Sequence, residues 1–141
     1  MKFVVDSSVA LKWVLPEIDS HRAVALRDDF RNGVHDLLAP DVFAIEVAHA
    51  LARAERRNII HPPEGTLKLV DVLGTLPVLH SYLPLLARAF EIASAARIGV
   101  YDCLYVALAE RETCDLITAD DRLVKNLQSR FPFLRPLATF P

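Results

Sequence analysis

The fold is decided by the stretch Phe3-Val4-Val5-Asp6-Ser7-Ser8-Val9, near the start of the chain. Its first three residues are apolar and favour a strand, which Asp6 ends. After the two serines, apolar residues recur at helical spacing from position 9 to 14, and Pro16 stops that pattern. The stretch therefore predicts a strand, a turn and a helix, with an aspartate at the carboxyl end of the strand.

The same succession of strands and helices continues along the rest of the chain. Strands are predicted at residues 37–39, 78–79, 116–117 and 134–139. Helices are predicted at residues 20–31, 41–57 with Asp41 as cap, 64–73, 84–96 and 102–113, with a last one capped by Asp120. Repeated strand–helix–strand units predict an α/β fold, in which helices cover both faces of a parallel sheet.

Composition and charge fit one folded domain spanning residues 1–141. Hydrophobic residues make up 52% and charged residues 24% of the chain, which excludes a disordered or low-complexity protein. The net charge is −2, so any contact with nucleic acid must use a local basic patch. Two cysteines, Cys103 and Cys114, are too few for a disulfide scaffold, and we expect reduced thiols in the core.

No stretch of the sequence is typical of a membrane span or a secretion signal. The longest run without a charged residue, at positions 72–87, is interrupted by Gly74, Pro77 and Pro84, and it is shorter than the ~20 apolar residues that a span needs. At the N-terminus, Asp6 interrupts the apolar run that follows Lys2. We therefore expect a cytoplasmic protein with no membrane partner.

Four acidic residues stand in unusually apolar surroundings. They are Asp6, Glu46, Asp102 and Asp120. Asp6 and Asp120 follow apolar strands, and sites in open parallel sheets lie beyond the carboxyl ends of strands. A carboxylate in apolar surroundings costs several kcal/mol unless Arg, Lys, helix-terminal amides or a metal ion compensates it. These four residues are therefore the candidate site.

Ordinary structural roles are the alternative explanation for the same residues. Asp6, Asp102 and Asp120 each stand at an expected helix start, where aspartate is a favoured cap. Glu46 lies inside an expected helix, and a partly buried salt bridge, for example to Arg53, would explain it. No Lys or Arg is interspersed in the four local segments, however, and clustered carboxylates without basic partners are what Mg²⁺ or Mn²⁺ requires.

Other catalytic motifs are incomplete. Glu46-x-x-His49 is half of a di-iron helix motif whose second half is missing, so we interpret His49 as an ordinary helix residue. Asp120 and Asp121 resemble the acidic pair of haloacid-dehalogenase-like phosphatases, but those need Asp-x-Asp after the first strand, where Ser8 stands here. The four glycines form no phosphate-binding loop, and no Gly-x-Ser-x-Gly elbow is present.

Four segments together resemble the PIN-domain nucleases, and specifically the VapC toxins of bacterial type II toxin–antitoxin systems. They are residues 3–9, 40–47, 101–109 and 116–123, which occur in the family's order and are spread over most of the chain. The resemblance implies a three-layer α/β sandwich with a central, mostly parallel sheet and helices on both faces. It also implies a metal-dependent endoribonuclease that hydrolyses RNA phosphodiester bonds.

The resemblance also implies roles for individual residues. The residues implied in catalysis and in binding one or two Mg²⁺ or Mn²⁺ ions are Asp6, Glu46, Asp102 and Asp120. Polar residues that would support them are Ser7, Ser8, Thr118 and Asp121. Candidates for contacts to the RNA backbone, each equally well explained as a solvated charge, are Lys12, Arg53, Arg56, Arg57 and Arg122.

Expected partners follow from the same resemblance. They are the RNA substrate, a cognate antitoxin protein and a second copy of the chain in a homodimer, for which Val70, Leu73 and Leu76 would suit packing. Two other functions stay open at this point. One is a haloacid-dehalogenase-like phosphatase, and the other is a non-catalytic PIN fold that binds RNA or protein.

Overall fold

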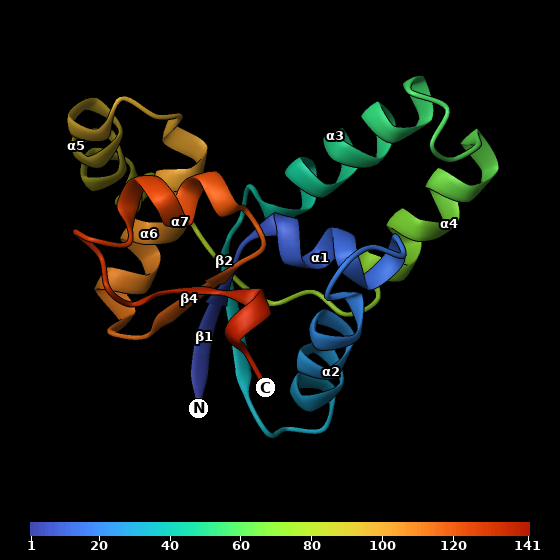
Figure 1. The fold of residues 1–141 in the computed structure, drawn as a ribbon, viewed down its shortest axis with the longest axis horizontal. Helices are drawn as coiled ribbons and strands as arrows, with labels where there is room; N and C mark the ends of the chain where they lie inside the picture. The colour runs from blue at the N-terminus through green and yellow to red at the C-terminus, as the bar shows by residue number, and fades with distance from the viewer.

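A five-stranded parallel sheet forms the centre of the computed structural model, which describes residues 1–141 (Figure 1). Its strands are β1 (Lys2–Val5), β2 (Asp36–Pro40), β3 (Val78–His80), β4 (Asp115–Thr118) and β5 (Leu134–Pro136). The order across the sheet is β3-β2-β1-β4-β5, and all neighbours are parallel. The chain moves outward from β1 in one direction and returns beside it with β4. The carboxyl ends of β1 and β4 are therefore the switch point where ligands bind in such sheets.

Seven α-helices and two short 3₁₀ turns connect the strands. The α-helices are α1 (Ser7–Val14), α2 (Ser20–Arg31), α3 (Phe43–Arg56), α4 (Pro62–Leu73), α5 (Leu86–Ala96), α6 (Val100–Glu112) and α7 (Asp121–Leu127). The 3₁₀ turns are η1 (Leu83–Leu85) and η2 (Leu137–Thr139). None of the helices combines the length and the apolar character needed to cross a membrane.

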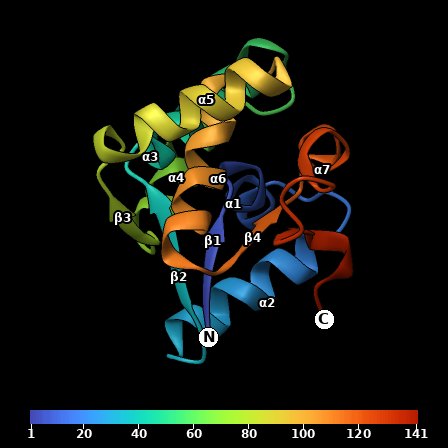
Figure 2. The ribbon, with the colours of Figure 1, turned by 90° about the vertical axis from the view of Figure 1, so that its left-hand side faces the viewer.

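Helices cover the sheet on both faces, as the alternation predicts. Helix α6 packs on β1, β2 and β4, and α5 packs on the outside of α6 (Figure 2). Helices α1 and α2 pack together on the opposite face, and α3 and α4 extend from α1 as a helical arm (Figure 1). The carboxyl ends of the central strands therefore open between this arm and the α5–α6 side.

The core explains the apolar runs of the sequence. Phe3, Val4 and Val5 of β1 are buried, as expected for a strand covered on both faces. Residues 103–109 of α6 are all buried, so this helix is apolar all round, which is typical of a helix inside the core. Both cysteines are free, with Cys103 buried and Cys114 partly buried.

Several predicted boundaries are wrong. Helix α3 begins at Phe43, and the carboxylate of Asp41 does not cap it but accepts a hydrogen bond from the backbone N–H of Tyr82 at 3.0 Å. Helix α6 begins at Val100 with Gly99 as N-cap, so Asp102 lies inside the first turn and is not a cap. The last strand ends at position 136 instead of 139, because a 3₁₀ turn follows it.

Candidate active site

Asp6 lies at the switch point, directly after β1, and its side chain is only 3% exposed. It occupies the N-cap position of α1, but its carboxylate makes no capping hydrogen bond. Instead, Asp6 Oδ2 accepts from the hydroxyl of Ser8 at 2.7 Å and from that of Thr118 at 2.8 Å. The other oxygen, Oδ1, accepts from neither of these hydroxyls.

Ser8 and Thr118 are themselves oriented by backbone amides. The N–H of Ala119 donates to Ser8 Oγ, and the N–H of Asp120 donates to Thr118 Oγ1, each at 3.0 Å. Each hydroxyl oxygen accepts one hydrogen bond from a backbone N–H and donates its own hydrogen to Asp6 Oδ2. The two hydroxyls predicted as supporting groups therefore hold Asp6 in one orientation.

Glu46 approaches this edge from α3. Its Oε1 accepts a hydrogen bond from the phenol of Tyr105, on α6, at 2.6 Å. The pKa of Glu46 is raised to about 7. Burial is the main cause, the Tyr105 hydrogen bond opposes it, and the charges of Asp6 and Asp102 contribute to the rise. The salt bridge to Arg53 that was the alternative explanation does not occur, since Glu46 takes part in no ion pair.

Asp102 and Asp6 are also hard to ionise. The pKa of Asp102 is raised to about 6, mainly by burial and also by the charges of Asp6 and Asp120, while Arg122 opposes the shift. The pKa of Asp6 is raised mainly by burial, against the lowering effect of its two hydroxyl donors. None of these carboxylates takes part in an ion pair, so burial and mutual repulsion both favour their protonated forms.

Asp120 has two roles. Its Oδ1 accepts from the backbone N–H groups of Arg122 and Leu123 at 3.0 and 3.2 Å, so its predicted capping of α7 is confirmed. Its charge nevertheless raises the pKa of both Asp6 and Asp102. A residue that caps a helix can therefore also belong to the candidate site.

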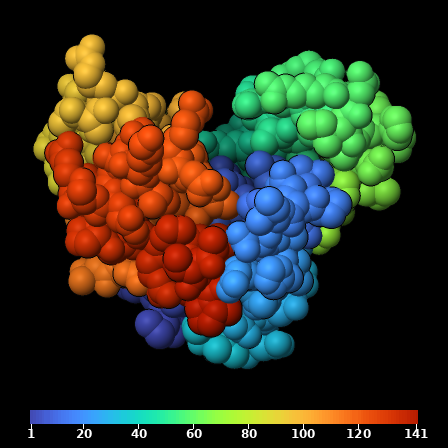
Figure 3. All heavy atoms as spheres, in the orientation of Figure 1, coloured from blue at the N-terminus to red at the C-terminus, as the bar shows by residue number.

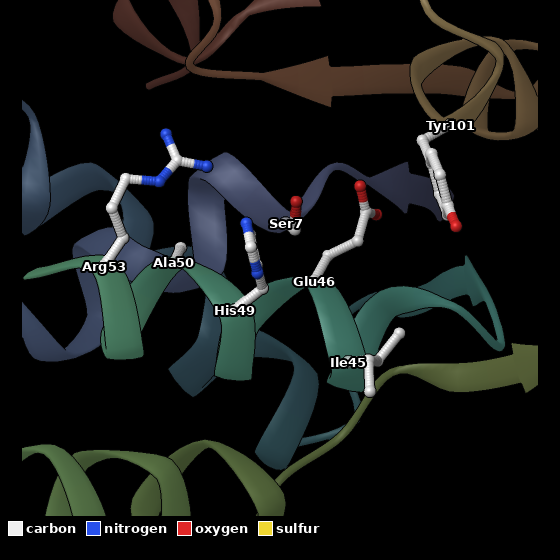
Figure 4. A pocket seen from close by; sticks show the side chains of 7 residues that line it. All are labelled: Ser7, Ile45, Glu46, His49, Ala50, Arg53 and Tyr101. Atoms are coloured by element: carbon white, nitrogen blue, oxygen red, sulfur yellow. The ribbon is translucent and has the colours of Figure 1, made fainter.

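Two hollows open at this edge of the molecule, where the surface dips between α3 and the α6–α7 side (Figure 3). The larger, of about 500 Å³, is lined by Glu46 and by residues of α1, α3 and α6 (Figure 4). The smaller, of about 240 Å³, is lined by Asp102, Asp120 and Arg122. No three His, Cys, Asp or Glu side chains lie close enough together to form a ready ligand group for a metal.

The remaining predicted residues fall into two groups. Ser7 and Arg53 line the larger hollow, and Arg122 lines the smaller one. Asp121 is exposed in the first turn of α7 and lines neither hollow. Lys12 donates to the carbonyl oxygen of Ile18 at 2.8 Å, which gives it a structural role.

Two further basic candidates lie apart from both hollows. Arg56 and Arg57 are exposed at the end of α3 and line neither cavity. The structure therefore places only Arg53 and Arg122, among the predicted RNA contacts, beside the carboxylates.

Sequence reasoning missed three residues of this region. Tyr105 is fully buried, and a buried phenol needs a hydrogen-bond partner, which is the signal that could have linked it to Glu46. His49 was interpreted as an ordinary helix residue, but it lines the larger hollow together with Tyr101. The position of Tyr101 directly before Asp102 was the available signal for its proximity to the site.

Comparison with known proteins gives the family. The PIN domain family matches residues 3–127. Ribonuclease VapC3 of Pyrobaculum aerophilum is 33% identical over 136 residues, which are 95% of this chain and 98% of that protein. Ribonuclease VapC9 of Mycobacterium tuberculosis is 30% identical over 129 residues, covering 92% of this chain and 94% of that one.

Two solved structures share the fold. PAE2754 from Pyrobaculum aerophilum superposes with a TM-score of 0.70 at 20% identity, over 99% of this chain and 94% of the other. VapBC2 from Rickettsia felis, bound to a DNA fragment from its promoter, gives a TM-score of 0.66 at 13% identity, over 96% and 98% of the two chains. By sequence match and by architecture, the chain belongs to the PIN-domain family, together with proteins named VapC ribonucleases.

Proposed function

We propose that this protein is a metal-dependent endoribonuclease and the toxin of a VapBC-type toxin–antitoxin pair. Its relatives named ribonucleases match over almost their whole length, which supports the activity. The observation that carries the proposal is the setting of Asp6. It is buried at the switch point, is held by two oriented hydroxyls, and lies near other carboxyl groups that take part in no ion pair.

The donor set suits Mg²⁺ or Mn²⁺, which prefer carboxylate oxygens. Asp6 and Asp120 would each contribute a carboxylate to hold the ion. Asp102 would complete the set, whereas Glu46 would stand beside it as the proton acceptor. Since no three of these groups form a ready ligand group, binding would draw the side chains together. A bound dication would supply Lewis acidity, which eases deprotonation of water and offsets the charge that develops on the phosphate.

The residues of the chain supply positioning and proton transfer. Tyr105 holds Glu46 through Oε1, which leaves Oε2 free to accept a proton from the attacking water. Arg122, beside Asp102 and Asp120, would contact the phosphate and offset its charge. A phosphatase of the haloacid-dehalogenase type is set aside, because the family is that of PIN domains.

The test is cleavage of labelled RNA by the purified protein with Mg²⁺, with Mn²⁺ and with EDTA. Asp6→Asn and Asp102→Asn should each abolish cleavage while circular dichroism shows a retained fold. Asp36→Asn is the matched control. Asp36 is the first residue of β2, at the amino end of the strand and away from the site, so this variant should cleave like wild type. Wild-type protein that bound RNA but cut it with neither ion would instead be a non-catalytic binding module.

The proposed partners are an antitoxin and a second copy of the chain. The solved VapBC2 structure is named as a complex, and we infer a comparable protein partner for this chain. Val70 and Leu73, on α4, are 61% and 45% exposed, which supports a role in self-association. Sedimentation at micromolar concentration should give a dimer of the 15.7 kDa chain, and Val70→Asp should weaken it. A wild-type protein that sediments as a monomer would contradict this assignment.

A further inference from the structure

The larger hollow has a wall made by one face of α3. Glu46, His49, Ala50 and Arg53 line it, at positions i, i+3, i+4 and i+7 of the helix (Figure 4). Ala50 contributes only a methyl group in the middle of this wall, where a longer side chain would occupy the cavity. With a volume of about 500 Å³, the hollow falls within the range typical of small-ligand sites.

The opposite side of the hollow carries an exposed aromatic ring. Tyr101 lies in the first turn of α6, directly before Asp102, and is 55% exposed. Its side chain extends beside Glu46 (Figure 4), and its phenol makes none of the hydrogen bonds found in the structure. The ring contributes little to the core, and its exposed surface at a polar hollow suits stacking against a flat ligand.

Arg53 supplies a cation at the far end of the same wall. Its guanidinium forms no ion pair or hydrogen bond, whereas Arg22, Arg27 and Arg88 are all paired. It lies two helical turns from Glu46, about 10 Å along the helix axis. An unpaired guanidinium at this distance from the carboxylates can bind a phosphate next to the one that they approach.

The lining groups match the parts of one nucleotide. An aromatic face suits a base, a guanidinium suits a phosphate, and the Ser7 hydroxyl and the His49 imidazole can hydrogen-bond to base edges. A base can enter such a hollow only when it is unpaired and unstacked, so the ligand must be single-stranded or in a loop. We propose that this hollow is a subsite for one unpaired RNA nucleotide next to the cleaved bond, with its base on Tyr101 and its phosphate on Arg53.

This subsite rests on the proposed ribonuclease function and names the residues that would contact the nucleotide beside the cut. It makes the hollow a determinant of where RNA is cut, because the identity of one nucleotide beside the scissile bond is sensed there. It also predicts that RNA in a continuous duplex is a poor substrate, since its bases cannot reach Tyr101.

Binding can be measured without metal or catalysis. The probe is a fluorescein-labelled, single-stranded RNA of random sequence, and its anisotropy is followed in EDTA as protein is added. Tyr101→Ala and Tyr101→Leu should both weaken binding about tenfold, because neither offers an aromatic face, whereas Tyr101→Phe should bind like wild type. Arg53→Ala should weaken binding and reduce the salt slope by about one.

Matched controls lie outside the hollow. Phe90→Ala removes an aromatic side chain on α5 that is 66% exposed, and Arg130→Ala removes an exposed cation after α7. Both should bind RNA like wild type. Sequencing of the ends produced with Mn²⁺ should show a base preference at one position beside the cut, and Tyr101→Ala should flatten that preference.

Three outcomes would overturn the subsite. If wild type cleaves RNA but the Tyr101 and Arg53 variants keep its affinity, salt slope and cut pattern, the hollow does not bind the substrate. If these variants lose only the binding of a co-expressed protein partner, the hollow is a protein-docking site. If wild type neither binds nor cleaves RNA with either ion, the ribonuclease function itself fails and the subsite fails with it.

Discussion

Tyr105 donates its phenolic hydrogen to Glu46 Oε1 over 2.6 Å, across 59 positions of the sequence. Burial raises the pKa of Tyr105, so the phenol stays protonated and acts only as a donor here. This contact joins the helical arm, through α3, to the central helix α6. It also fixes which oxygen of Glu46 remains free at the larger hollow.

Tyr105→Phe should shift the pH dependence of cleavage. The phenol lowers the pKa of Glu46, so its removal should raise that pKa above about 7. The acidic limb of the pH–rate profile should then move to higher pH, because Glu46 must be ionised to accept a proton. The profile is measured with Mg²⁺ for the variant, for wild type and for Tyr82→Phe, which alters an exposed tyrosine outside both hollows. An unmoved acidic limb would show that Glu46 does not govern it.

Glu46→Gln should stabilise the metal-free protein at alkaline pH. The pKa of Glu46 in the folded protein, about 7, lies above its usual 4.5, so the folded state keeps a proton that the unfolded chain has lost. The stability that this proton provides is full below about pH 4.5 and is lost as pH rises through 7. Glutamine does not titrate, so the variant does not lose this stability as pH rises. At pH 8 in EDTA, the variant should gain about 1–2 kcal/mol in the free energy of unfolding, allowing for solvent screening of a partly buried group.

Urea unfolding at pH 5 and pH 8 checks this difference, with Asp36→Asn as the control for removing an exposed charge. The gain should be much smaller at pH 5 than at pH 8. Equal effects at both pH values would mean that Glu46 titrates normally in the folded protein.

Asp102→Asn should show whether Asp102 is a metal ligand or only a structural residue. The pKa of Asp102 is raised to about 6 by burial and by the charges of Asp6 and Asp120, so the substitution relieves repulsion at neutral pH. In EDTA the variant should melt higher than wild type, by roughly 1 kcal/mol of stability. Added Mn²⁺ should raise the melting temperature of wild type much more than that of the variant. An unaltered response to Mn²⁺ would remove Asp102 from the site.

Thr118→Val should remove one of the two hydrogen bonds that orient Asp6, with little change in the shape of the side chain at position 118. The variant loses the 2.8 Å hydrogen bond to Asp6 and the acceptor for the Asp120 N–H. We expect a loss of about 1–3 kcal/mol in unfolding free energy and weaker Mn²⁺ binding by calorimetry. Thr66→Val, at an exposed position of α4, is the matched control. Wild-type Mn²⁺ affinity in Thr118→Val would show that the hydroxyl does not position Asp6 for the metal.

The succession of strands and helices could be predicted from the sequence. Along most of the chain, the apolar periodicity and the positions of proline and glycine indicate the same elements. The predicted helix at 20–31 has the same bounds as α2. The start of α6 was misplaced because aspartate is favourable both as a cap and inside the first turn, where Asp102 lies. Local sequence cannot distinguish these two positions when Gly99 also serves as a cap.

The apolar surroundings of the four acidic residues could be read from the sequence, but their hydrogen-bond partners could not. The contact between Tyr105 and Glu46 depends on how α3 and α6 meet in space. The larger hollow depends equally on Tyr101, which approaches the Glu46 end of α3 from another helix (Figure 4). Periodicity shows which face of one helix is apolar, but it does not show which two helices face each other.

The hydroxyl pair around Asp6 also has a consequence for synthesis of the protein. Asp6 is synthesised before Thr118, which follows it by 112 positions. The carboxylate acquires this partner only when β4 has paired with β1, a contact between distant parts of the chain that forms late in folding. A partly folded chain therefore contains Asp6 without the Thr118 hydrogen bond that orients its carboxylate. The proposed nuclease site is therefore assembled late, after β4 has taken its place beside β1.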